Sequence, residues 1–263
     1  MKYFSKIKKL LICISLTVIS LPLFSGCSEE PKPQIKELLV YCGITMVQPM
    51  VEIAKIIEIQ EKCHFEILKG GSGHLYEVIT SNRIGDIFMP GSASYMEKAQ
   101  REKIVKDTVV VGYNQAVLMV QKDNPLKITP ELCNLTDPRY AVVIANPKSC
   151  SIGRLSKQLL ETLNLYQSTL DNAVYMTTDS KDLIKAIKER KADLALNWQA
   201  PASWPENREA VTILPLDKKL ATRRALILGR LKFSKHPEIV KKFMQLAVSP
   251  EGQAIFKRYG LHD

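Results

Sequence analysis

Apolar runs of strand length alternate with amphipathic helical patterns along the first part of the chain. In order, they read as strand, helix, strand, helix and strand over residues 38–42, 47–59, 65–68, 73–81 and 86–89. Two parallel strands need a crossover connection, usually a helix, so this alternation predicts an α/β fold with a mostly parallel sheet.

A second strand and helix series follows a Pro-bearing stretch at 124–130. Further strands are expected at 109–111, 116–120, 140–145 and 194–197, and further helices at 154–163, 183–191, 237–248 and 250–259. Two such series predict two lobes with a cleft between them, each lobe a mostly parallel sheet flanked by helices. We expect lobe one over residues 37–115 and 216–263, and lobe two over residues 116–215.

The N-terminus has the pattern of an export signal. A basic stretch over residues 2–9 is followed by an apolar run over 10–24, which is shorter than the roughly 20 residues of a membrane-spanning helix. The ending Ser25-Gly26-Cys27 resembles a bacterial lipobox, although Phe24 stands where Leu is commonest. We expect residues 1–27 to be a lipoprotein signal, Cys27 to be lipidated, and residues 28–36 to be a polar tether. A plain cleaved signal with an incidental cysteine is the alternative.

This leader predicts a periplasmic or cell-surface location, with the chain held on the cytoplasmic membrane by its lipid. The formal net charge of +10 comes from 37 Lys and Arg against 27 Asp and Glu. Basic residues are spread along the chain rather than gathered in blocks, which disfavours a nucleic-acid partner and suits a surface that meets anions or anionic lipid.

Four cysteines beyond the leader could pair in three ways. Cys42 and Cys150 follow predicted strands, whereas Cys63 and Cys133 precede them. Because strand starts and strand ends lie at opposite edges of an open α/β sheet, we expect free thiols.

Four loops at predicted strand ends are candidates for a binding site. They cover residues 42–45, 69–73, 146–153 and 197–201, and they are rich in Gly, Ser, Thr and Asn. In open α/β sheets ligands bind at the carboxyl ends of strands, and helix N-termini there offer free N–H groups with partial positive charge. The four loops together predict an anion cradle.

In its order of motifs the chain resembles the molybdate-binding family, which comprises substrate-binding proteins of bacterial ABC importers with the type II periplasmic-binding fold. The matching stretches are Leu39-Val40-Tyr41-Cys42-Gly43, Gly70-Gly71-Ser72-Gly73, Gly85-Asp86-Ile87-Phe88-Met89-Pro90-Gly91, Lys122-Asp123-Asn124-Pro125, Ala192-Asp193-Leu194-Ala195 and Ser249-Pro250-Glu251-Gly252-Gln253. The resemblance implies two hinged lobes that close on a tetrahedral oxyanion, molybdate or tungstate, and deliver it to a membrane permease and ATPase complex.

The resemblance also implies a ligand set, residue by residue. Ser72 matches directly, Thr45 stands in place of a serine, and Trp198 stands in place of a tyrosine. Backbone contacts fall near Ile152 and Ser180. The implied site has no catalytic residue, no cation-binding metal ligands and no cofactor; we expect a monomer that closes around the anion itself.

Several alternatives stay open from the residues. The ligand could be another small anion, such as a sulfate-like anion, phosphate or phosphonate, and the chain could be a ligand-sensing lipoprotein. His74 could join the anion but is expected to face solvent, and Lys69, Lys148, Arg154 and Lys181 could steer it. A hydrolase is disfavoured, since His74 stands where the nucleophile elbow around Ser72 needs Gly.

Overall fold

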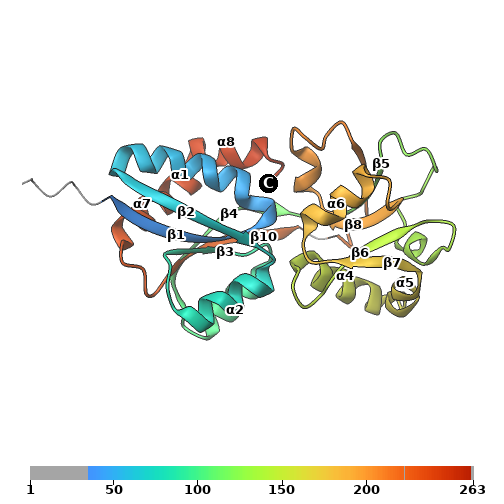
Figure 1. Ribbon diagram of the computed structural model, residues 1–263, viewed down its shortest axis with the longest axis horizontal. Coiled ribbons are helices and arrows are strands. Elements are labelled where there is room, and N and C mark those ends of the chain that lie inside the picture. The colour runs from blue at the N-terminus through green and yellow to red at the C-terminus, as the bar shows by residue number, and fades with distance from the viewer. Residues whose placement is uncertain (1–34, 222, 262–263) are drawn as a thin grey trace, which may run out of the picture. The chain divides into compact units, whose positions relative to one another are not determined.

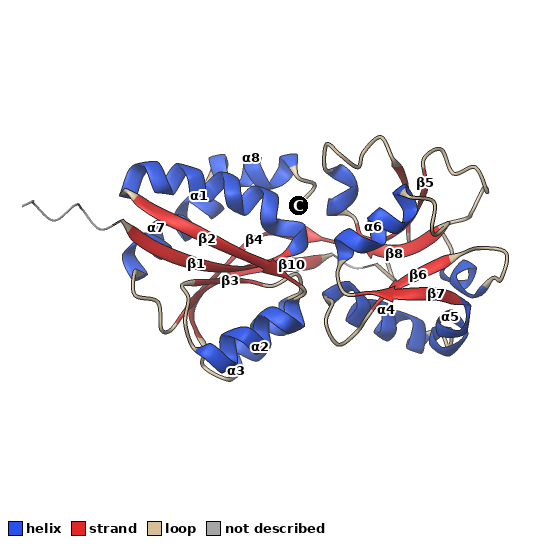
Figure 2. Cartoon of the chain, in the orientation of Figure 1, coloured by secondary structure: helices blue, strands red, loops and turns tan. Residues whose placement is uncertain are grey.

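Two five-stranded mixed sheets flanked by helices make up the computed structural model, which describes residues 35–221 and 223–261 (Figures 1 and 2). The first sheet has the order β2 (Cys63–Gly70), β1 (Lys36–Gly43), β3 (Ile87–Met89), β10 (Arg224–Leu231) and β4 (Val105–Asn114). The second has the order β7 (Ala173–Thr177), β6 (Val142–Ala145), β8 (Leu194–Trp198), β5 (Ala116–Gln121) and β9 (Val211–Pro215). The predicted signal and lipidation of Cys27 lie outside the described residues.

The middle of the first sheet is buried on both faces, which explains the nearly continuous apolar run of β1. Val40 and Cys42 belong to a core formed with α1 (Val47–Glu61), α7 (Pro237–Val248) and α8 (Pro250–Arg258). Tyr41 points to the other face and joins a second core under α2 (Ser72–Asn82) and α3 (Ala93–Arg101). Successive strand residues alternate between faces, so β1 is apolar at both sets of positions.

The second sheet has its own core. All four residues of β6 are buried, and α4 (Ser151–Thr162) and α6 (Ser180–Lys188) both pack on β6 and β8. Figure 1 shows α6 above these strands and α4 below them, and α5 (Tyr166–Asn172) contacts α4 and β6. Among the described residues, no helix is long and apolar enough to cross a membrane.

The α/β class, the two-sheet architecture and the mostly parallel character of each sheet are confirmed, with one strand in each sheet running against the other four. β10 runs antiparallel to β3 and β4, and β5 runs antiparallel to β8 and β9. The reason lies in the connections between the sheets. β4 passes into β5 through the single residue Gln115, so the chain enters the second sheet without a crossover helix and its strand runs against the parallel set.

The two C-terminal helices return to the first sheet. Pro237 and Pro250 occupy first-turn positions, where the missing N–H costs no hydrogen bond, and so both helices begin where the sequence predicts. Phe243 of α7 packs at 5.2 Å, ring to ring, on Phe65 of β2. The lobe boundaries themselves stay a prediction.

Candidate ligand-binding site

The N-terminal ends of four helical segments meet at one small cavity. Its volume is about 10 Å³, close to the space of one water molecule. The lining residues come from the loops after β1 and β2, the loop after β3, the starts of α4 and α6, and the end of β8: Gly43, Ile44, Thr45, Gly70, Gly71, Ser72, Gly91, Cys150, Ser151, Asp179, Ser180 and Trp198. The sequence-predicted loops are thus brought together.

Four of the five predicted ligand residues line this cavity: Thr45, Ser72, Ser180 and Trp198. The fifth, Ile152, is fully buried in the first turn of α4, directly after lining residues. Thr45 is 3% exposed, and its hydroxyl donates to the Met46 sulfur at 2.7 Å, which is a weak acceptor.

Ser72 is the best-defined polar group of the cavity. It is 2% exposed, and its Oγ accepts a hydrogen bond of 2.8 Å from the backbone N–H of Gly91. A hydroxyl has one donor proton and can accept as well, so an oxygen that accepts an N–H keeps its own proton for another partner. The Gly91 amide therefore leaves Ser72 ready to donate.

The Ser151 hydroxyl also accepts a hydrogen bond from a protein N–H group. Ser151 was not among the ligand residues predicted from the sequence. Its Oγ accepts a 3.0 Å hydrogen bond from the indole Nε1 of Trp198, and both side chains are buried. The indole N–H of Trp198, expected to donate to the ligand, is thus directed at Ser151. The signal for Ser151 was present, since it lies in the predicted loop 146–153 and opens α4.

The helix N-termini add backbone donors. Gly71 and Cys150 precede α2 and α4, and neither provides a capping side-chain hydrogen bond. First-turn amides have no partner within a helix, and the helix dipole makes this end partly positive. At α6, by contrast, Asp179 Oδ1 accepts from the amides of Lys181 and Asp182 at 2.8 and 3.0 Å. One carboxylate therefore stands in the cavity wall.

The cavity thiol is unsuited to nucleophilic chemistry. Burial raises the pKa of Cys150 to about 11, although the neighbouring amides of Gly153 and Ile152 lower it somewhat. The thiol is therefore neutral near pH 7. Cys42, Cys63, Cys133 and Cys150 are all free cysteines. No group of three or more metal-ligating side chains occurs in the described part of the chain.

The loops of the two sheets touch beside the cavity. The Gly73 N–H donates to the Ser149 carbonyl at 3.3 Å. Arg154 of α4 donates to the Tyr95 hydroxyl of α3 at 2.7 Å, with its guanidinium 4.3 Å from the ring centroid. These contacts join elements of the first sheet to α4 and the loop before it.

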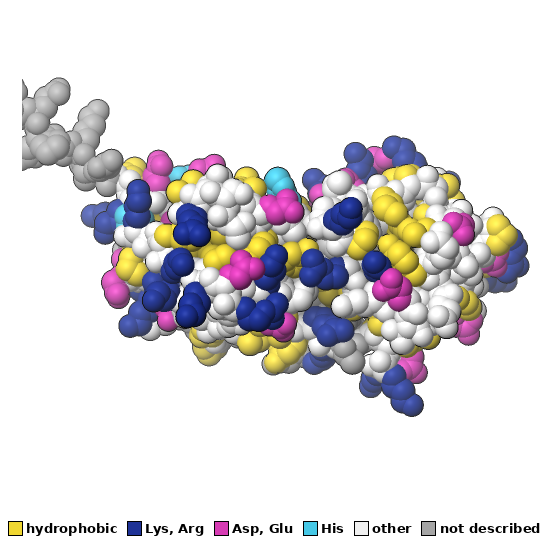
Figure 3. Space-filling view, turned by 90° about the horizontal axis from the view of Figure 1, so that it is seen from below, with side chains coloured by type: hydrophobic (Ala, Val, Ile, Leu, Met, Phe, Trp, Pro, Cys, Tyr) yellow, Lys and Arg dark blue, Asp and Glu magenta, His cyan; other side chains and the backbone are white. Residues whose placement is uncertain are grey.

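Other candidate groups lie outside the cavity. His74 is exposed, as expected, and so are Lys69, Lys148 and Lys181. Figure 3 shows Lys and Arg side chains interspersed with acidic and apolar ones rather than massed together.

Asp86, from one of the matching stretches, has a structural role. One of its carboxylate oxygens accepts from the Leu39 amide, and the other accepts from the Ser234 hydroxyl.

Residues 38–262 match the model of a family described as bacterial extracellular solute-binding proteins. The chain belongs to this family. A binding protein of Haemophilus influenzae is 25% identical over 228 residues, covering 86% of this chain and 91% of the relative. An ABC transporter substrate-binding lipoprotein of Bacillus subtilis, YvgL, is 24% identical over 248 residues, covering 90% of this chain and 92% of its own length.

Solved structures with the same fold bind different ligands. The periplasmic molybdate-binding protein of Azotobacter vinelandii is 17% identical, with a TM-score of 0.73 over 85% of this chain and 98% of that one. A periplasmic thiamin-binding protein is 15% identical, with a TM-score of 0.76 over 88% of this chain and 84% of that one. These likenesses show the type II periplasmic-binding fold, and the ligand has to be argued from the site.

Proposed function

We propose that this chain is the solute-binding lipoprotein of an ABC importer, and that it binds molybdate or tungstate in the cavity around Ser72. One observation carries the proposal. Two buried hydroxyls, on Ser72 and Ser151, each accept a protein N–H and so keep a proton to donate. Hydrogen bonds of this kind to a charged acceptor contribute roughly 1.5–3 kcal/mol each.

The size of the cavity favours a compact ligand. At about 10 Å³ it is close to the space of one water. A five-atom oxyanion therefore demands less separation of the surrounding loops than an organic cation such as thiamin. Helix N-termini also favour negative over positive charge.

The donor-rich wall favours an anion without a proton of its own. Phosphate near neutral pH brings a proton that needs an acceptor, and an unpaired buried donor costs about 1–3 kcal/mol. Asp179 carries the carboxylate among the lining residues, and its Oδ1 is already engaged by two amides. Fully ionised molybdate and tungstate avoid this cost. Sulfate avoids it too, but once the loops separate to admit an anion, the larger molybdate and tungstate reach more of the surrounding donors.

A melting experiment with an anion series tests the proposal. At 100 times its dissociation constant, a ligand stabilises the protein by about 2.7 kcal/mol. We expect molybdate and tungstate to raise the melting temperature well above the effect of sulfate, with little effect of phosphate. Ser72→Ala should lose most of the shift and His74→Ala, at an exposed position, should keep it. Strongest stabilisation by phosphate, or by thiamin, contradicts the proposal.

Anchoring through Cys27 is the second part of the proposal. The lipoprotein relative from Bacillus subtilis and the Ser25-Gly26-Cys27 ending support it. The parent chain is expected in the membrane fraction after export, and Cys27→Ala in the soluble extracytoplasmic fraction. A Cys27→Ala protein that still partitions wholly with membranes would refute the lipid anchor. Delivery to a permease and ATPase, or signalling to a membrane sensor, would follow the same binding step.

A further inference from the structure

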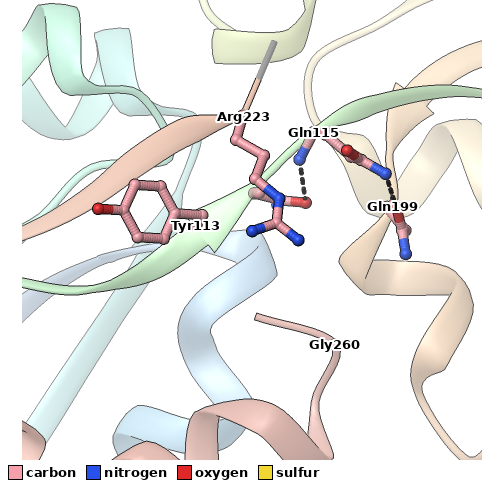
Figure 4. A pocket seen from close by; sticks show the side chains of 6 residues that line it. Tyr113, Gln115, Gln199, Arg223 and Gly260 are labelled. Carbon is pink, nitrogen blue, oxygen red and sulfur yellow. Dashed lines mark hydrogen bonds between the residues drawn. The ribbon is translucent and has the colours of Figure 1, made fainter. Parts of the chain in front are cut away.

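A second polar cavity lies where the chain crosses from one sheet to the other (Figure 4). Its volume is about 40 Å³, which is the space of about three waters. It is lined by the end of β4, the crossing residue, the residue after β8, the residue before β10 and the C-terminal segment: Tyr113, Asn114, Gln115, Gln199, Arg223 and Gly260.

Asn114 supplies a buried donor to this cavity. The side chain is 4% exposed, and its Oδ1 accepts from the amides of Gln115 at 3.0 Å and Ala200 at 3.3 Å. These two bonds fix the orientation of the side-chain amide, because only the oxygen can accept them. The Nδ2 group is left without a partner among the described residues. Buried donors of this kind call for an acceptor.

Two further donors line the same space. The Nε2 of Gln115 donates to the Oε1 of Gln199, which leaves both Nε2 protons of Gln199 available. Figure 4 shows the Arg223 guanidinium between Tyr113 and the two glutamines. No ion pair of Arg223 with another described residue is found. None of the lining residues carries a carboxylate.

We propose that this crossover cavity is a second binding site, and that its ligand is a small oxyanion, either a short carboxylate or an inorganic anion. Arg223 supplies the charge, and the Asn114 Nδ2 and Gln199 Nε2 groups supply neutral donors. A guanidinium matches the two oxygens of such an anion. The volume suits an anion of about three to five heavy atoms.

The crossover cavity is separate from the cavity around Ser72. Trp198, the last residue of β8, lines the first, and Gln199, the residue after β8, lines the second. A ligand in the crossover cavity touches the crossing segment at Gln115, the end of the second sheet and the C-terminal Gly260. The inference therefore stands independently of the function proposed for the first cavity.

Nuclear magnetic resonance of ¹⁵N-labelled protein tests the site directly. In a Ser72→Ala background, which weakens the first cavity, formate, acetate, sulfate and phosphate are titrated at constant ionic strength. We expect the side-chain amide signals of Asn114 and Gln199 to shift and saturate with at least one of these anions. A comparison of the carboxylates with the inorganic anions in the series identifies the class of anion that the site prefers.

Variants decide whether the shifts come from the proposed donors. Arg223→Gln is expected to weaken the binding at least tenfold, while the matched control Arg224→Gln, at the adjacent exposed arginine, leaves it within twofold. Gln199→Glu keeps the oxygen that accepts from Gln115 but replaces the free donor, so it should also weaken binding at an unchanged melting temperature. Shifts that never saturate, or equal affinity in Arg223→Gln and Arg224→Gln, would show an adventitious ion only and overturn the proposal.

Discussion

In the first cavity, protein N–H groups donate hydrogen bonds to serine hydroxyl oxygens. Each of these hydroxyls therefore keeps its own proton free to donate. Trp198 acts on one of them, since its indole N–H donates to the Ser151 Oγ at 3.0 Å. Trp198 therefore both lines the cavity and orients a second lining residue. Its size serves a second purpose, because a fully buried indole also fills the core of the second sheet.

A double-mutant cycle separates these roles at the residue scale. Ser151→Ala should weaken molybdate binding by about tenfold to a hundredfold, since it removes a charge-assisted hydrogen bond. Trp198→Phe should weaken it less, by loosening Ser151. If Trp198 acts through Ser151, the double variant binds as weakly as Ser151→Ala alone, and calorimetric titration measures this. Fully additive losses would instead assign Trp198 a contact of its own.

At the scale of elements, the glycine at position 91 allows the loops around the first cavity to approach one another. A Cβ added to Gly91 would lie 2.7 Å from the Ser151 Oγ and 3.4 Å from the Ser72 Oγ, inside the space for a ligand. Gly91→Ala should therefore weaken molybdate binding at least tenfold in a titration. Gly70→Ala should have a smaller effect, because its Cβ first meets Leu75 at 3.4 Å. Equal affinities of Gly91→Ala and the parent protein would contradict this geometry.

Periodicity predicted the elements that form the centre of each sheet. The buried runs of β1 and β6 and the leucine spacing of α4 carry strong patterns, and the prolines at the starts of α7 and α8 place those helices well. Once these strands were predicted, the loops at their ends could be predicted as well.

Other elements were missed for physical reasons. Val174, Tyr175 and Met176 of β7 are 57%, 41% and 46% exposed, so this edge strand shows no alternation. The helix α3 is mostly polar, and β10 is bounded by arginine rather than by turn residues. The Ser151 pairing with Trp198 depends on two segments that only the fold brings together.

At the scale of the whole molecule, the loop contacts beside the cavity indicate a closed arrangement of the two sheets. Tyr95 and Arg154, with Gly73 and Ser149, join elements of the first sheet to elements of the second. If these contacts form as the ligand binds, scattering should report a smaller radius of gyration with molybdate than without. Tyr95→Phe, which keeps the ring and removes the hydroxyl, should bind several-fold more weakly. Unchanged dimensions at saturating molybdate, with binding verified independently, would count against closure.

Anomalous diffraction from crystals grown with tungstate tests the central claim most directly, because tungsten marks the position of the anion. We predict one strong peak in the cavity, with anion oxygens within hydrogen-bond distance of the Ser72 and Ser151 hydroxyls and close to Thr45 and Ser180. A peak only at the crossover cavity or on the surface, or no peak at saturating tungstate, would contradict it.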